Sequence, residues 1–178
     1  MACRVQKKWP TLKAADYRIV VIDQNTQVVK TEQKRSWFPV NSRPRLPVSG
    51  GRKSVNLLGA VTDDGDRFIS FVEGRFTGKV AAHFLRALQQ EFGKKLVIVL
   101  DNAPYFIAKT LKKQAAKDGL LLEYLPAYAP EMNPLEQCWR QLNDGRANRL
   151  YREISELKAY LTARLSTLTS PKIYEYLC

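Results

Sequence analysis

The chain has 178 residues, of which 45% are apolar, enough for one compact α/β domain with a hydrophobic core. Its 29 Lys and Arg against 17 Asp and Glu give a formal net charge of +12, which favours a polyanionic partner and nucleic acid first of all. The alternative is a basic surface that is only solvated. One histidine and three widely spaced cysteines exclude a His-rich metal centre and support neither a disulfide framework nor a structural zinc site.

No apolar run approaches the roughly 18 residues that a membrane span needs. The first ten residues, MACRVQKKWP, carry charge but are not followed by the apolar stretch of a signal peptide. We therefore expect a soluble, cytoplasmic protein with no membrane partner. Residues 1–15 are interpreted as a basic lead-in, and residues 16–178 are expected to form a single domain.

Strand patterns dominate the first half of the chain. Short runs rich in β-branched and apolar residues predict strands at residues 17–23, 34–38, 54–61 and 67–72. The last two flank the turn signal Asp64-Gly65 and are expected to form an antiparallel β-hairpin. The preceding stretch, NSRPRLPVSGGRKS, combines Pro, Gly and basic residues and predicts an exposed loop.

Helices and strands alternate in the second half. Apolar residues at helical spacing predict a helix that Thr77 caps and that runs to about Phe92. Further helices are predicted at residues 105–117, from about 133, and at 154–168. The run LVIVL (96–100) is apolar at every position, as expected of a strand covered on both faces in a parallel part of a sheet, and residues 120–125 predict another strand. The order β-β-β-β-α-β-α-β-α-α implies a mixed sheet with helices on its faces.

Two acids end predicted strands. Asp23 ends the first one and Asp101 follows LVIVL, so their carboxylates lie side by side if the two strands are parallel neighbours. Each would raise the pKa of the other, and a divalent cation would relieve that repulsion. Oxygen ligands without His or Cys favour Mg²⁺ or Mn²⁺. The alternative for both acids is an ordinary turn residue, in DQNT and in LDNAP.

A third acid, Glu136, has a local explanation. In MNPLEQCW, Asn133 is typical of a helix N-cap, Pro134 of the first helical position and Glu136 of the third, so the stretch indicates a capping box. Arg140, four residues later, can also pair with Glu136. The 34 residues between Asp101 and Glu136 hold one helix and one strand, enough chain to return the second acid to the first.

Several blocks of the sequence resemble, in order, those of the DDE transposases of the mariner-type superfamily and its prokaryotic insertion-sequence relatives: VVIDQ, RSWFPVNSRP, SVNLLGAVTDDGDRF, FTGKVAAHFLRAL, LVIVLDNAPYF and LEYLPAYAPEMNPLEQCWRQL. The resemblance covers about Asp16 to Tyr176 and lacks the family's N-terminal helix-turn-helix region. The chain has Gln24 where many relatives have Glu, and Tyr105-Phe106 where many have a His.

The resemblance implies a ribonuclease H-like fold and a catalytic, metal-binding triad of Asp23, Asp101 and Glu136. Two ions, Mg²⁺ or Mn²⁺, are implied, with Asp23 bridging them, Asp101 completing one site and Glu136 the other. The implied activity is that of a transposase catalytic domain, which cleaves DNA and transfers strands at one centre. Such a protein is expected to associate with the nucleoid.

The partners implied are double-stranded DNA, both transposon ends and target, a second copy of the chain on DNA, and a separate chain that carries the DNA-binding region. Phosphate contacts are expected from basic residues around the triad, whereas Trp37 and Trp139 are predicted to be packing residues. The basic candidates are Arg43, Arg45, Arg52, Lys53, Arg140, Arg146 and Arg149.

Other interpretations stay open. A degenerate or domesticated core would bind DNA without cutting it, and another ribonuclease H-like nuclease, such as a junction resolvase, is disfavoured by the Pro-rich stretch before Glu136. A small-molecule enzyme of the doubly wound class finds no glycine-rich nucleotide fingerprint after any strand. The absent N-terminal region is consistent with an excised domain, a product of split reading frames or a decayed gene.

Overall fold

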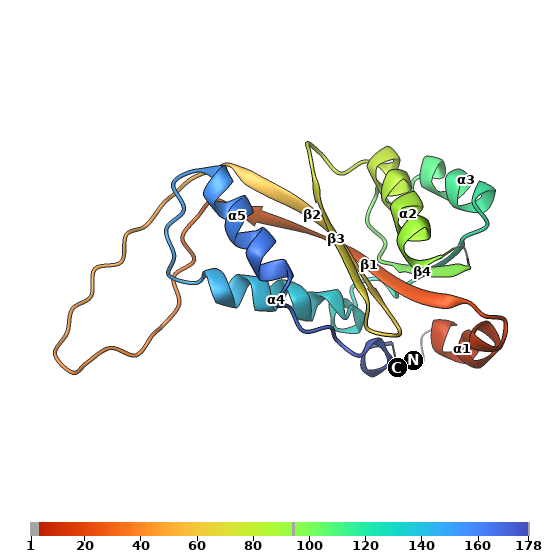
Figure 1. The fold of residues 1–178 in the computed structure, drawn as a ribbon, viewed down its shortest axis with the longest axis horizontal. Helices are drawn as coiled ribbons and strands as arrows, with labels where there is room; N and C mark the ends of the chain where they lie inside the picture. Colours follow the sequence, from red (N-terminus) through yellow and green to blue (C-terminus); the bar gives the residue numbers. More distant parts are fainter. Residues whose placement is uncertain (1–3, 94, 178) are drawn as a thin grey trace.

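A five-stranded sheet forms the centre of the protein, which is described here by a computed structural model of residues 4–93 and 95–177 (Figure 1). The strands are β1 (Arg18–Val28), β2 (Ser54–Thr62), β3 (Arg67–Val72), β4 (Leu96–Leu100) and β5 (Leu121–Tyr124). They lie in the order β3-β2-β1-β4-β5, with β1 antiparallel to β2 and parallel to β4. The mixed sheet and the β2–β3 hairpin predicted from the sequence are confirmed.

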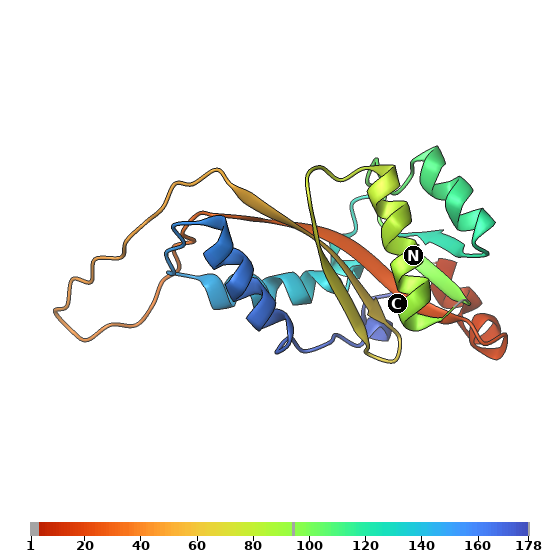
Figure 2. The ribbon, with the colours of Figure 1, turned by 45° about the horizontal axis from the view of Figure 1, so that its top comes forward.

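Helices cover both faces of this sheet (Figures 1 and 2). They are α1 (Arg4–Ala14), α2 (Gly78–Phe92), α3 (Lys109–Lys117), α4 (Leu135–Arg146) and α5 (Ile154–Leu165), with short 3-10 helices η1 (Pro130–Met132) and η2 (Ile173–Glu175). Side chains alternate along β1: Ile19 and Val21 join the core beneath α4 and α5, whereas Val20 and Ile22 join the core beneath α2 and α3. Strand β4 is buried throughout, as its unbroken apolar run predicts.

The strand predicted at residues 34–38 is wrong. That stretch belongs to an exposed arm, residues 33–48, which extends far from the sheet and has neither helix nor strand (Figure 1). Strand β1 instead runs past Asp23 to Val28, where it pairs with Ser54. Because β1 and β3 already occupy the two edges of β2, residues 34–38 find no strand edge there to pair with.

Two helix boundaries test the capping arguments. Helix α2 begins as predicted, because the Thr77 hydroxyl accepts the Val80 N–H at 3.2 Å. Helix α3 begins at Lys109 and not at Tyr105: the chain first makes a turn in which the Phe106 N–H donates to the Ala103 carbonyl at 2.9 Å, and the Phe106 ring is fully buried. The helix ends as predicted before Gly119, whose φ of 70° suits glycine.

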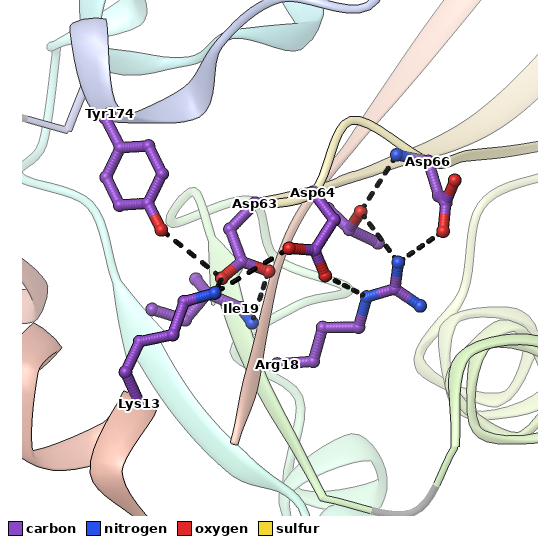
Figure 3. A network of polar contacts seen from close by, with 8 residues as sticks. Lys13, Arg18, Ile19, Asp63, Asp64, Asp66 and Tyr174 are labelled. Carbon is purple, nitrogen blue, oxygen red and sulfur yellow. Dashed lines mark hydrogen bonds and ion pairs between the residues drawn. The ribbon is translucent and has the colours of Figure 1, made fainter. Parts of the chain in front are cut away.

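The basic lead-in contains helix α1, which lies at the end of the sheet where β2 turns into β3. The Trp9 and Tyr174 rings meet at 4.3 Å between centroids. Figure 3 shows Lys13 of α1 reaching Asp63 in the turn between β2 and β3, beside Arg18, which contacts Asp64 and Asp66. These contacts join the start of the described chain to the hairpin turn, while the boundary between a lead-in and a domain stays a prediction.

Two composition-based expectations concern membranes and cysteines. Across residues 4–93 and 95–177, no helix combines the length and the apolar character needed to cross a bilayer. Cys138 is a buried free thiol of α4. Cys3 and Cys178 lie outside the described residues.

Candidate active site

Strand pairing brings Asp23 and Asp101 together. Strands β1 and β4 are parallel neighbours, as the prediction required, and Val21 pairs with Val99, so two residues further on Asp23 faces Asp101 across the pair. By strand alternation both acids fall on the α4 side of the sheet. The prediction that Asp23 ends its strand is wrong, because β1 continues to Val28. The alternative of a turn at DQNT is wrong for the same reason.

Asp101 serves as a turn residue as well as a candidate ligand. Its Oδ1 accepts the N–H of Ala103 at 2.9 Å, which closes a side-chain turn directly after β4. The next residue, Asn102, donates through its side chain to the carbonyl of Leu125, which directly follows β5, at 2.8 Å. These two bonds fix the segments that follow β4 and β5, at the end of the sheet where Asp101 lies.

Glu136 lies in the first turn of α4, and its helix start is only partly the predicted capping box. The Asn133 side chain accepts the Leu135 N–H at 3.1 Å, as an N-cap residue does. The Asn133 N–H donates to the Pro130 carbonyl at 2.9 Å, so it is not available for the reciprocal bond to Glu136. Within residues 4–93 and 95–177, the predicted ion pair between Glu136 and Arg140 is also absent. The Glu136 carboxylate is therefore left for other partners.

All three predicted acids line one cavity of about 390 Å³. Asn102, Asn133 and the loop from Leu125 to Pro130 complete its walls. The acids surround this space without converging: in the described part of the chain, no three His, Cys, Asp or Glu side chains are grouped closely enough to hold a metal ion. Asp101 and Glu136 nevertheless lie near enough to Asp23 for their negative charges to raise its pKa.

Electrostatics make Asp23 the most perturbed of the three acids. The residue is 5% exposed, and burial raises its pKa to about 7, with repulsion from Asp101 and Glu136 acting in the same direction. Hydrogen bonds from Trp139 and from the Gln24 backbone lower the pKa and partly oppose that shift. A buried carboxylate beside two others suits a hard divalent cation, because the cation neutralises the charge that burial disfavours.

Trp139 is the site residue whose role the sequence did not reveal. Its indole Nε1–H donates to Asp23 Oδ2 at 2.8 Å in the protein interior. It was predicted to pack, and it does, lying 2% exposed one turn after Glu136. The same prediction for Trp37 is wrong, because that residue is 102% exposed on the arm. The available signal was general: a buried tryptophan usually finds an acceptor for its N–H.

Gly59 makes room for that tryptophan. It is the β2 residue paired with Asp23. A Cβ atom at this position would lie 2.6 Å from Trp139 Cη2 and 3.1 Å from Leu135 Cδ2. Helix α4 can therefore approach the sheet closely enough for the indole to reach Asp23 only because residue 59 has no side chain.

Gln24 and Tyr105, where this chain departs from the family that it resembles, lie together beside the acids. Burial raises the pKa of Tyr105, and the nearby Asp101 and Asp23 raise it further, whereas a hydrogen bond with the Gln24 side chain lowers it. Tyr105 therefore stays a neutral phenol near the carboxylates. Its ring also contacts Phe76 at 5.5 Å between centroids.

Six of the seven predicted phosphate contacts are exposed: Arg43, Arg45, Arg52, Lys53, Arg140 and Arg149. Of these, Lys53 pairs with Glu153 at 2.8 Å, and Arg149 stacks over Tyr160 at 5.2 Å.

Arg146 corrects the list, because it is 3% exposed. Its guanidinium donates to Gln27 Oε1 at 2.7 Å and to the Lys30 carbonyl at 2.9 Å. It also donates to the Val28 carbonyl. Arg146 therefore holds the base of the arm and is withdrawn from the predicted DNA contacts.

Comparison with protein families identifies the class of this fold. The family described as DDE superfamily endonuclease matches residues 18–158. The chain belongs to this family. The matched region of this DDE superfamily endonuclease contains the whole sheet and all three acids of the cavity.

Solved structures of Mos1 transposase share the ribonuclease H-like fold of this DDE endonuclease domain. The Mos1 paired-end complex with the left transposon end has a TM-score of 0.70 at 16% identity, covering 98% of this chain and 56% of that chain. The catalytic domain of Mos1 mariner transposase has a TM-score of 0.65 at 14% identity, covering 98% and 84%. The mixed sheet with helices on both faces is thus the predicted fold.

One curated relative also matches the domain. The uncharacterized protein y4pE/y4sA of Sinorhizobium fredii (strain NBRC 101917 / NGR234) is 29% identical over 77 residues, which are 43% of this chain and 55% of that protein. This chain therefore spans about half the length of that relative and of the Mos1 paired-end complex protein.

Proposed function

We propose that this DDE endonuclease domain is the catalytic domain of a transposase, which cleaves DNA strands and transfers them at one centre. Asp23, Asp101 and Glu136 form its catalytic, metal-binding triad. The observation that carries the proposal is the cavity in which β1, the end of β4 and the first turn of α4 each place one carboxylate. Membership of the endonuclease family supports the reaction class.

The donor set fits Mg²⁺ or Mn²⁺, since all three predicted ligands are carboxylates and no histidine lines the cavity. Asp23 would bridge two ions, with Asp101 and Glu136 each completing one site. When bound, such ions activate a water or a 3′-hydroxyl and stabilise the leaving oxygen. Mos1 paired-end complexes have been solved with Mn and with Mg, which supports the choice of metal.

Neighbouring residues orient the three carboxylates in this proposal. Trp139 holds Oδ2 of Asp23 by its 2.8 Å hydrogen bond, and the Gln24 backbone also donates to this carboxylate. The side-chain turn at Ala103 takes one oxygen of Asp101. At Glu136, the Pro130 carbonyl accepts the amide that a capping box would have used, so both oxygens stay available.

The proposed partners are double-stranded DNA, as transposon ends and target, and a second copy of the chain on that DNA. The net charge of +12 and the exposed arginines of the arm support the first. On the same arm, Trp37 is 102% exposed and Val40 is 91% exposed, which supports a protein partner for the arm. A separate chain with the DNA-binding region and association with the nucleoid complete the proposal.

Nicking of supercoiled DNA with Mn²⁺ tests the triad. The wild type is expected to nick the plasmid, whereas Asp101→Ala and Glu136→Gln should lose most of that activity, because each removes a metal ligand. Glu131→Gln is the matched control, since Glu131 is an exposed acid near Glu136 that does not line the cavity.

Equal nicking by the wild type and both triad variants would sink the assignment. A wild type that binds DNA in a salt-sensitive manner but never nicks it would favour the DNA-binding remnant instead. One observation favours this second candidate. Within residues 4–93 and 95–177, no three His, Cys, Asp or Glu side chains lie close enough together to hold a metal ion.

A further inference from the structure

Tyr128 stands out at the rim of the acid cavity. It lines that cavity, yet it is 102% exposed, so none of its ring packs on the protein. A tyrosine ring normally buries a large area and contributes packing energy. Here the ring is presented to solvent beside the three carboxylates of the proposed triad.

The loop holds Tyr128 in an uncommon backbone conformation. Its φ of 58° lies in the left-handed region, which bulky residues rarely adopt. The loop is tied at both ends: the Leu125 N–H donates to the Leu100 carbonyl at 2.7 Å, and the Met132 N–H donates to the Ala129 carbonyl at 3.1 Å. Pro126 and Pro130 stiffen the chain between these anchors. A rigid, uncommon conformation that displays a ring next to a candidate active site indicates a ligand for that ring.

The neighbouring chemistry identifies the ligand. A cavity that takes a phosphodiester has the adjacent sugar and base at its rim, and an aromatic ring there stacks on the flat face of any base. Stacking on one base needs that base to leave its neighbours, as at a single-stranded end or at a flipped nucleotide. The apolar walls beside the ring, Pro126, Ala127 and Pro130, suit the edge of such a base.

We propose that Tyr128 is the platform of a nucleobase subsite, which stacks an unpaired base next to the scissile phosphate. The subsite rests on the proposed function, because it supposes that the acid cavity holds a DNA strand. Tyr128 is a positioning residue in this scheme: it aligns the strand and takes no part in bond making or breaking.

The test compares two DNA probes in a Glu136→Gln background with Mn²⁺. One is a short duplex with a single-stranded 3′ end that contains 2-aminopurine, and the other is the blunt duplex of the same sequence. Tyr128→Phe and Tyr128→Trp keep a ring. Tyr128→Asn removes the ring but tolerates the left-handed conformation, so the loop shape is preserved.

The variants with a ring should prefer the single-stranded end and quench its 2-aminopurine. Tyr128→Asn should bind that end about 5- to 150-fold more weakly, the range that corresponds to loss of one stacked base, while its affinity for the blunt duplex stays unchanged. An unchanged melting temperature in Tyr128→Asn shows that the overall fold is intact.

Equal preference and equal quenching in Tyr128→Asn and Tyr128→Phe would overturn the subsite. A change of oligomeric state in Tyr128→Asn, with the DNA preference intact, would overturn it too and assign the ring to a protein contact. Failure of the proposed function is seen separately, as absence of Mn²⁺-dependent nicking in the wild type. Absence of DNA binding by every variant would overturn both proposals.

Discussion

At the scale of single residues, the site is organised around one unfavourable charge. Asp23 is buried, faces two other acids and keeps a single side-chain donor, Trp139. Its environment therefore disfavours ionisation until a cation is present. This residue carries the clearest pH dependence that the structure predicts.

Metal-free stability should depend on pH through Asp23. Its pKa is about 7 in the folded state and near 4 when unfolded, so the folded state binds the proton more tightly. Stability from this group is therefore full below about pH 4, falls as the pH rises to 7 and stays low above it. Asp23→Asn should stabilise the protein in EDTA at pH 8 by on the order of 2 kcal/mol, and should change little at pH 4.

Thermal unfolding at both pH values checks this prediction. Glu91→Gln, which alters an exposed acid of α2, serves as the control and should show no such pH difference. Added Mn²⁺ should raise the melting temperature of the wild type much more than that of Asp23→Asn. An equal gain for Asp23→Asn at pH 4 and pH 8 would contradict the buried, raised carboxylate.

Gly59 and Trp139 should be energetically coupled. Gly59→Ala places a Cβ against the indole and should destabilise the wild type by about 1–3 kcal/mol. Trp139→Phe lacks Cη2 and Cζ2, the two indole atoms that the new Cβ would crowd most. In that background, Gly59→Ala should therefore cost less, and a double-mutant cycle by urea denaturation measures the difference. Strict additivity would show that the close approach does not limit the packing of α4.

At the scale of elements, the sequence predicted what depends on local pattern. The unbroken apolar run of β4, the turn signal of the hairpin and the Thr77 cap each act within a few residues, and each prediction is confirmed. The predicted strand ends too early, at Asp23, because the rest of β1 is polar. That part of β1 is stabilised by pairing with β2. That pairing joins distant segments and leaves no local signature.

The site followed the same division. Reasoning about parallel strand ends placed Asp23 beside Asp101, and the resemblance supplied the triad as a unit. The hydrogen bond of Trp139 to Asp23 spans 116 residues, and the bond of Arg146 to Gln27 spans 119. An arginine in α4 looks like any surface cation until the tertiary structure buries it, so the sequence could not separate Arg146 from Arg140.

Arg146 should contribute to folding stability, whereas Arg140 should not. Arg146→Met removes donors from Gln27 and two backbone carbonyls at the base of the arm, so it should destabilise the protein by about 2–4 kcal/mol. Arg140→Met, at an exposed position of the same helix, should leave stability nearly unchanged. Urea denaturation measures both, and faster proteolysis of the arm in Arg146→Met would show where the loss acts. Equal stability of the two variants would contradict the structural role of Arg146.

At the scale of the whole molecule, the arm carries exposed arginines that add to the positive charge of the protein. Arg43 and Arg45 lie on the arm, Arg52 follows it in the sequence, and all three side chains are exposed. The arm can therefore lose charge without loss of stability. Any role of these residues in binding DNA should appear in the salt dependence of affinity.

Replacing Arg43, Arg45 and Arg52 by Gln should flatten the plot of log affinity against log salt concentration. Each lost phosphate contact lowers the slope by about 0.9, so the triple variant should lose at most about 3. Fluorescence anisotropy with a mixed-sequence duplex measures the slope, and an unchanged melting temperature excludes unfolding. A slope equal to that of the wild type would remove the arm from the DNA surface.

The pairing of Asp23 with Gly59 makes the site a check on correct folding. A slip of β1 by one residue against β2 would turn Asp23 towards α2 and set Leu58 or Ala60 in the place of the glycine beneath Trp139. The Trp139 indole could then neither pack against β2 nor donate its hydrogen bond to Asp23. Chains with a misaligned sheet would thus lack the shared carboxylate cavity, so an incompletely folded molecule would not carry out the proposed DNA cleavage.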